Sequence, residues 1–213
     1  MRIKNRGISI VWKIIIVILE LIGLQLALRL FTDNVNWSML NYFTNLSNIA
    51  VLIYFAVSVI ALLKNKEKVT VYPAVKGAVT MSITVTMLVA YFLLGGFNMG
   101  GSSSLTLILL HDVCPLMVLL DWILFDEKGL LTGKFPLQGV AAPLLYFVYA
   151  MIAANIGDGI GHGSSRYPYP FIDVDVLGLP KVLLIVIGLV AFFLALGFGF
   201  YRLDRFLHRR EKR

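Results

Sequence analysis

Long apolar runs follow one another along this chain, separated by short polar stretches. The runs cover residues 8–30, 40–63, 72–94, 105–125, 135–155 and 177–201. Each is long enough to cross the roughly 30 Å hydrocarbon core of a bilayer as an α-helix. The pattern therefore predicts an all-α, polytopic membrane protein with six transmembrane helices in one bundle. Residues 1–213 are expected to form this single domain.

Composition supports the same class. Of 213 residues, 59% are hydrophobic and 15% are charged, which excludes intrinsic disorder and disfavours an ordinary soluble domain. Runs of helical length argue against the short alternating strands of a barrel. The chain has one cysteine, Cys114, so an internal disulfide and a cysteine-based metal cluster are both excluded.

The formal net charge of +7 would suggest nucleic acid as a partner of a soluble protein, but here it predicts topology. Lys and Arg gather before the first run, after the second, after the fourth and in the tail, whereas the other side has only Arg29, Arg166 and Lys181. The positive-inside rule then puts both termini in the cytoplasm. The first run is too long for a signal peptide and no cleavage site follows it, so it is expected to be retained.

A polar stretch opens the second run. Its sequence, at residues 41–48, is NYFTNLSN, and Asn41, Thr44 and Asn48 fall on one helical face with Ser47 beside them. Such groups need partners inside the protein when they lie in a bilayer. We therefore expect this face to line a buried polar pocket, where it meets His111 of the fourth run.

The depth of the polar residues favours a common site. With a rise of about 1.5 Å per residue, Thr44 lies roughly 6 Å and His111 roughly 9 Å inside the outer ends of their helices. Gln25 in the first run and Asn155 in the fifth fall in the same layer. Four helices thus supply polar groups at one level, which predicts a pocket near the outer leaflet.

A hydroxyl and an imidazole at matched depth meet the first requirement of nucleophilic catalysis. Thr44 is the candidate nucleophile, and His111 is the candidate base that takes its proton. Four residues are candidates to bind substrate and to donate hydrogen bonds to an oxyanion: Asn48, Ser47, Gln25 and Asn155. Asp112, adjacent to His111, points about 100° away and is a poor candidate to orient the ring.

Plainer interpretations stay open. A threonine in a membrane helix commonly bonds back to a carbonyl of its own helix, and these polar groups can act only as packing contacts in a membrane scaffold. Glu20 and Asp121, acids within the bilayer, are either neutral and hydrogen-bonded or part of a proton path. The alternative function is therefore a proton-coupled transporter or carrier of a small or lipidic solute. No metal and no cofactor are expected, because no second histidine lies in a run beside His111.

Two further features concern the architecture around the predicted pocket. Pro115 frees the carbonyl of His111 and predicts a kink there. Residues 156–176, rich in Gly, Pro and Tyr, are expected to form an ordered lid over the outer opening. The glycines around His162 lack the strand and the lysine of a phosphate-binding loop.

The chain resembles the androgen-induced membrane hydrolases and their bacterial six-span relatives. The resemblance covers most of the chain and is closest at residues 42–48 (YFTNLSN), at 111–115 (HDVCP) through Asp121 and Trp122, and at 169–173 (YPFID). It implies hydrolysis of fatty acid esters of hydroxy fatty acids, with Thr44 and His111 as the catalytic pair. The implied partners are a membrane lipid or fatty acyl ester and the lipid bilayer, and the implied location is a bacterial cytoplasmic membrane. The function expected from sequence is thus a membrane-embedded lipid-ester hydrolase or acyl transferase.

Overall fold

The structure is a computed structural model that describes residues 2–64, 70–95, 105–161 and 163–212. Within these ranges the chain forms helices and loops, and no strand occurs there. The predicted basic loop after the second run lies largely outside the described residues, and so does His162.

Six helices are long and apolar enough to cross a membrane, as the sequence predicted. They are α1 (Arg6–Leu28), α2 (Phe43–Lys64), α3 (Pro73–Leu93), a composite helix over Leu105–Leu124, α6 (Phe135–Ala153) and α8 (Leu179–Glu211). The composite helix consists of α4 (Leu105–Ile108), η3 (Leu109–Val113) and α5 (Cys114–Leu124). The protein is thus a multi-pass membrane protein.

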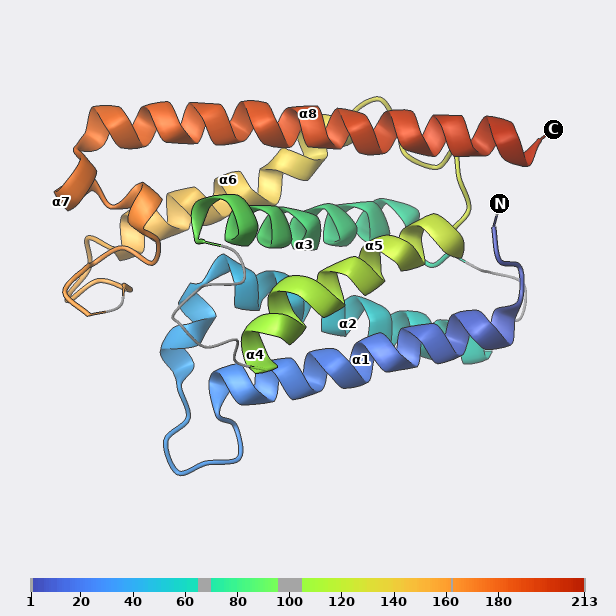
Figure 1. The fold of residues 1–213 in the computed structure, drawn as a ribbon, viewed down its shortest axis with the longest axis horizontal. Helices are drawn as coiled ribbons and strands as arrows, with labels where there is room; N and C mark the ends of the chain where they lie inside the picture. The colour runs from blue at the N-terminus through green and yellow to red at the C-terminus, as the bar shows by residue number, and fades with distance from the viewer. Residues whose placement is uncertain (1, 65–69, 96–104, 162, 213) are drawn as a thin grey trace.

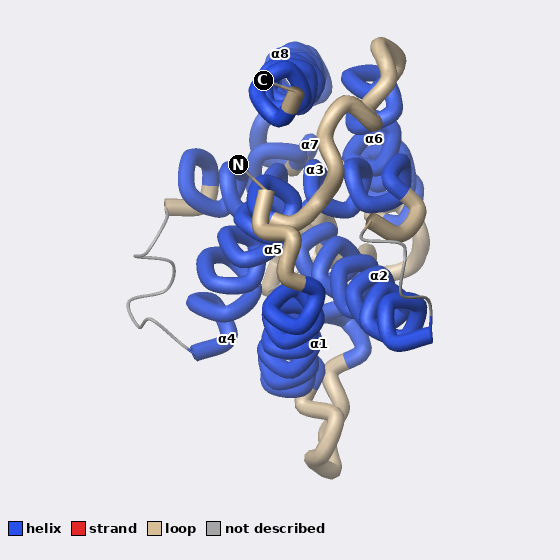
Figure 2. Tube along the Cα trace, turned by 90° about the vertical axis from the view of Figure 1, so that its right-hand side faces the viewer, coloured by secondary structure: helices blue, strands red, loops and turns tan. Residues whose placement is uncertain are grey.

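The helices run side by side along the long axis, and the two termini lie at one end of the bundle (Figure 1). We call this the terminal end. Viewed along the helices, α3 lies near the middle, with α1 and α8 at opposite edges (Figure 2). Accordingly α3 packs against α2, α5 and α6, while α8 packs mainly against α6. The most buried span is therefore α3, and α8 is the least buried.

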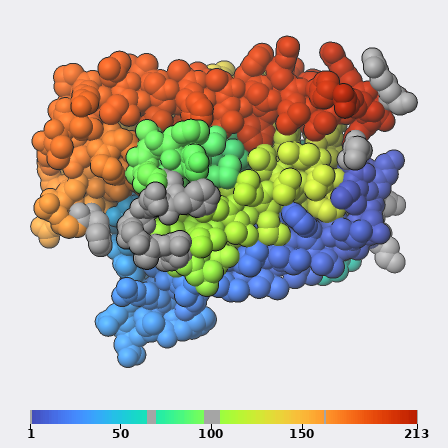
Figure 3. All heavy atoms as spheres, viewed as in Figure 1, coloured from blue at the N-terminus to red at the C-terminus, as the bar shows by residue number. Residues whose placement is uncertain are grey.

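The ends of the helices follow local sequence signals. Asn5 caps α1 by accepting a hydrogen bond from the main-chain nitrogen of Ile8, at 3.1 Å. Prolines lie in the first turn of α3, α6 and α8, where a missing N–H costs nothing. After α1 the chain turns through Arg29, which has a positive φ of 53°. The segment from there to α2 projects from the end opposite the termini (Figure 3).

The second helix begins later than predicted. Residues 40–42 were expected to be part of the span, but Trp37–Asn41 forms a 3-10 helix, η1, and α2 begins at Phe43. Two tyrosines of α6 hold this segment: the hydroxyl of Tyr146 donates to the carbonyl of Asn41, and that of Tyr149 donates to its side-chain oxygen, both at 2.8 Å. These long-range bonds outweigh the helical preference of three residues.

The last helix extends ten residues beyond the predicted end, to Glu211. The basic tail is itself helical. Cations near a helix C-terminus interact favourably with its dipole, and three arginines stack on aromatic rings one turn earlier. These pairs are Arg202 with Phe198, Arg205 with Tyr201, and Arg210 with Phe206.

The irregularity predicted near Pro115 is a short π-helix at Leu109–Val113. In this register each N–H bonds to the carbonyl five residues earlier, as Cys114 does to Leu109. Proline has no N–H, so the carbonyl left without its helical donor is that of Leu110. With the α-helical spacing expected from the sequence, the free carbonyl would be that of His111, one residue later.

Candidate functional site

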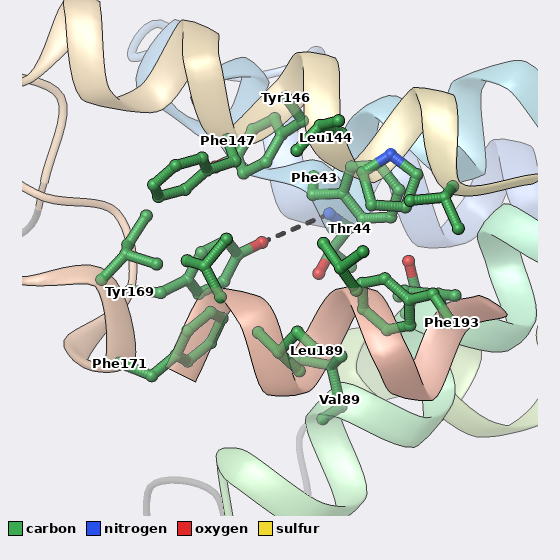
Figure 4. A pocket seen from close by; sticks show the side chains of 18 of the residues that line it. Phe43, Thr44, Val89, Leu144, Tyr146, Phe147, Tyr169, Phe171, Leu189 and Phe193 are labelled. Carbon is green, nitrogen blue, oxygen red and sulfur yellow. Dashed lines mark hydrogen bonds between the residues drawn. The ribbon is translucent and has the colours of Figure 1, made fainter. Parts of the chain in front are cut away.

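An apolar cavity of about 80 Å³ lies in the half of the bundle away from the termini. Side chains of α2, α3, α6, α8 and the loop before α7 (Val174–Leu177) enclose it (Figure 4). Hydroxyl groups among the lining belong to Thr44, Thr86, Tyr146 and Tyr169; the rest of the lining is apolar. The apolar residues are Phe43, Val85, Val89, Ala90, Leu94, Val140, Pro143, Leu144, Phe147, Phe171, Ile172, Val186, Leu189, Val190 and Phe193.

Thr44 lies in the first turn of α2 and faces this cavity. Its main-chain N–H donates to the hydroxyl of Tyr169, at 3.4 Å, and its side chain also interacts with that hydroxyl (Figure 4). The first turn of a helix has N–H groups without intrahelical partners, so this bond satisfies one of them. Of the predicted site residues, Thr44 is the one that lines the cavity.

Tyr169 is the principal polar residue that sequence reasoning missed. Its ring is almost fully buried, stacked on Phe171 and edge-on to Tyr42. Burial raises the pKa of its hydroxyl, whereas the bonds to Thr44 oppose that rise. The phenol therefore stays protonated at neutral pH. The hydroxyl of Tyr169 also interacts with the hydroxyl of Tyr146, so the hydroxyl groups of Thr44, Tyr146 and Tyr169 lie together on the cavity wall.

The loop before α8 covers one wall of the cavity with Tyr169, Phe171 and Ile172. Local polar contacts order it. Asp173 caps α7 and accepts a hydrogen bond from Ser165 at 2.7 Å, and Arg166 forms a two-bond ion pair with Asp175. The described part of residues 156–176 thus forms one wall of the cavity, and its role as a lid over an outer opening stays a prediction.

Ser47 and Asn48 lie one turn further along α2, next to the cavity but outside its lining. Ser47 shares a hydrogen bond of 2.7 Å with Thr86 and donates to the carbonyl of Thr44 at 2.9 Å. The amide of Asn48 donates to the same carbonyl at 2.7 Å and to the carbonyl of Leu110 at 3.2 Å. Both side chains therefore connect α2 to its neighbours.

His111 lies in the π-helix and does not line the cavity. Its Nδ1 is 3.3 Å from the carbonyl of Leu107, one turn earlier on the same helix. No hydrogen bond joins His111 to Thr44 in the described part of the chain; Asn48 and Leu110 lie between the two segments. Asn48 thus links the main chain at Thr44 to the main chain next to His111. The side chains of Thr44 and His111 are not hydrogen-bonded to each other in the described residues.

Gln25 and Asn155 also lie outside the lining. Asn155 is exposed, and its amide donates to the carbonyl of Met151 on its own helix, at 2.7 Å. Gln25 is half-buried on α1, and its carbonyl accepts the main-chain N–H groups of Arg29 and Leu30. Their roles as substrate-binding residues stay predictions.

Among the described residues, no group of three or more His, Cys, Asp or Glu side chains could hold a metal ion. No protein-family model, curated protein or solved structure matches the chain.

Proposed function

We propose that this protein is a membrane-embedded lipid-ester hydrolase or acyl transferase, with both termini cytoplasmic. The observation that carries the proposal is that Thr44, the predicted nucleophile, lies on the wall of an apolar cavity beside the hydroxyl of Tyr169. Cavities lined by apolar groups with a few placed polar ones are typical ligand sites. The apolar lining suits an acyl chain, and the two hydroxyls suit its ester end.

In the proposed reaction the Oγ of Thr44 attacks the ester carbonyl. The alcohol leaves, an acyl-threonine forms, and water or another acceptor then takes the acyl group. The hydroxyl of Tyr169 would turn its proton from the hydroxyl of Tyr146 to the developing oxyanion. Loss of one such donor typically lowers the rate about 10²–10³-fold. This donor replaces Asn48 and Ser47 in that role, because their side chains are already bonded to main-chain oxygens.

The proposal retains His111 as the base that takes the threonine proton. In the structure its ring faces the carbonyl of Leu107, so this role requires the ring to turn toward α2 when substrate binds. Hydrogen bonds of catalytic groups are often long or misaligned before substrate is present. The cavity therefore supports Thr44 as the nucleophile. The role of His111 as the base is a separate hypothesis and needs its own test.

The purified protein, in detergent or vesicles, should be labelled by a fluorophosphonate probe and should cleave a fluorogenic acyl ester. Thr44→Ala should abolish both, and Thr44→Ser should retain part of each because a hydroxyl remains. Thr80→Ala removes a buried threonine of α3 outside the cavity and serves as the control. Full cleavage by folded Thr44→Ala protein would reject the nucleophile, and full cleavage by His111→Ala would reject the base.

The alternative function, a proton-coupled transporter or carrier, draws on Glu20. This side chain is fully buried in α1, and neither carboxyl oxygen has a hydrogen bond of normal geometry within the described residues, although the thiol of Cys114 interacts with it. Asp121, the other predicted carrier, is held by two lysines. Proton-dependent solute uptake into vesicles that is lost in Glu20→Gln and kept in Thr44→Ala would favour transport over hydrolysis.

A further inference from the structure

A network of buried charges lies at the terminal end of the bundle, far along the helices from the cavity. Asp121 of α5 accepts hydrogen bonds from Lys13 of α1, at 2.6 and 2.8 Å, and from Lys76 of α3, at 2.5 Å. All three side chains are at most 3% exposed. Both oxygens of Asp121 thus accept hydrogen bonds, and this side chain ties α1, α3 and α5 together.

Two further aspartates beside this network are not satisfied. Asp126 follows α5 and Asp204 belongs to α8, and both are at most 2% exposed. Oδ2 of Asp126 and Oδ1 of Asp204 have no hydrogen-bond partner among the described residues. Lys76 is the nearest cation to the former, but at 3.7 Å it is beyond hydrogen-bond distance.

The neighbouring donors are committed elsewhere. The ammonium of Lys128 donates to the main-chain carbonyls of Trp122 and Asp126. The N–H of Leu131 donates to Oδ2 of Asp204 at 3.1 Å. Buried acceptors without donors are costly, at about 1–3 kcal/mol each. This part of the protein therefore lacks at least one hydrogen-bond donor.

A small cavity separates the two carboxyl groups. It has a volume of about 10 Å³, close to the space needed by one water molecule, and both Asp126 and Asp204 line it together with Lys76. A divalent metal ion would add two positive charges to a region that already holds three lysines, and a metal ion does not supply a hydrogen-bond donor. A proton adds one charge, neutralises one buried carboxylate and supplies the missing donor.

We propose that Asp126 and Asp204 form a proton-binding site, in which the two carboxyl groups share one proton through a single water molecule. The proton comes from the solvent at the terminal end and binds Oδ2 of Asp126. That group then donates to the water, and the water donates to Oδ1 of Asp204. This site is independent of Thr44 and of the proposed ester chemistry.

The electrostatic surroundings agree with this assignment. Burial raises the pKa of Asp126, Asp121 adds to that rise, and Lys76 is the main group that opposes it. The charged groups that face or adjoin the site come from four helices and one loop. They are Lys13 of α1, Lys76 of α3, Asp121 of α5, Glu127 and Lys128 of the following loop, and Asp204 and Glu211 of α8.

The test is infrared spectroscopy of the full chain in lipid vesicles, titrated with pH. The carbonyl band of a protonated carboxylic acid should persist at pH values where exposed aspartates are ionised. Selective ¹³C labelling of aspartate should shift this band, which separates it from Glu20. Asp126→Asn should remove it and Asp204→Asn should move its frequency. Asp175→Asn, at an exposed acid outside this cavity that pairs with Arg166, should leave it unchanged.

The proposal is overturned if the aspartate band is absent at neutral pH, if it survives in Asp126→Asn, or if sodium at constant pH removes it, which would indicate a cation site. Asn resembles a protonated Asp in shape, so Asp126→Asn should fold. If circular dichroism shows that it does not, Asp126→Glu is used instead. The site is supported if the carboxylic-acid band of this variant no longer shifts when aspartate is ¹³C-labelled, and it is rejected if the band still shifts.

Discussion

The side-chain amide of Asn48 on α2 takes the place of a main-chain donor for Leu110 on the neighbouring π-helix. The donor and acceptor atoms are 3.2 Å apart, and the same amide also bonds the carbonyl of Thr44 at 2.7 Å. Because Pro115 cannot supply an N–H in the π register, the carbonyl of Leu110 depends on this contact. Asn48 thereby fixes the helix of the candidate nucleophile against the helix of the candidate base.

Replacing Asn48 by alanine should lower the free energy of unfolding by about 1–2 kcal/mol, because a buried carbonyl loses its donor. The measurement is reversible unfolding in mixed micelles. Asn155→Ala is the matched control, since Asn155 is exposed and bonds its own helix. Equal effects of the two substitutions would contradict the bridging role.

Asp121→Asn should be far more destabilising, by about 3–5 kcal/mol, because it leaves buried Lys13 without a counter-ion and leaves Lys76 with only the more distant Asp126. Lys13→Met should cost less, since Lys76 still pairs with Asp121. The same unfolding assay measures both. Asp175→Asn removes a solvent-exposed partner of Arg166 and should change the stability little. A small effect at Asp121 would contradict the closed ion network.

The stability of the protein should depend on the ionisation of Asp126. Its pKa is raised in the folded state, so the folded protein binds the proton more tightly than the unfolded chain does. The resulting stabilisation is complete below the ordinary pKa of about 3.9 and is lost as pH rises through the folded value. Asp126→Asn should therefore show a smaller fall in melting temperature with rising pH than the wild type. Parallel curves would be inconsistent with the shift.

Filling the cavity should block lipid binding without touching Thr44. Val89→Trp places a large ring in the lining from α3 and should weaken binding of a fluorescent fatty acid about tenfold or more. Leu184→Trp adds the same ring to α8 where the side chain is 69% exposed and away from the cavity, so its binding should be unchanged. Equal affinity of the two variants would show that the acyl chain binds elsewhere.

The crossing of α6 and α8 depends on Gly197. A Cβ at this position would lie 2.8 Å from the main-chain Cα of Pro136, so Gly197→Ala forces the helices apart. We expect a loss of about 1–3 kcal/mol in unfolding free energy. Gly199→Ala, where a Cβ meets nothing within 4 Å, should be neutral or slightly stabilising because alanine favours helix. A neutral Gly197→Ala would show that this crossing is not close-packed.

The six spans were predictable because bilayer-length apolar runs depend on composition rather than on tertiary contacts. The start of α2 differed from the prediction because hydrogen bonds to residues distant in the sequence hold the preceding segment. Tyr146 and Tyr149 hold Asn41 outside α2, and no local signal in residues 37–42 reveals partners that lie more than 100 residues away. The π-helix likewise moved the free carbonyl from His111 to Leu110, which helical spacing alone does not show.

The candidate site was only partly readable. Thr44 was found because it shares a helical face with other polar residues at the start of an apolar run, but its neighbour Tyr169 lies in a loop whose path depends on the whole fold. The matched depths of Thr44 and His111 did not give the rotation of their helices, and rotation decides which side chains meet. Lys13 and Lys76 were detectable as charges within apolar runs, although only the folded bundle shows that both face Asp121.

The shared carboxylate at Asp121 also constrains how the protein is assembled. Lys13 precedes it by 108 residues and Lys76 by 45, so both lysines are synthesised well before their counter-ion. A lysine inserted alone costs a few kcal/mol in a bilayer, and chains generally fold from the N-terminal side during synthesis. We therefore expect α1 and α3 to remain near the membrane surface until α5 has been synthesised. Their stable insertion would then depend on pairing with Asp121 of α5.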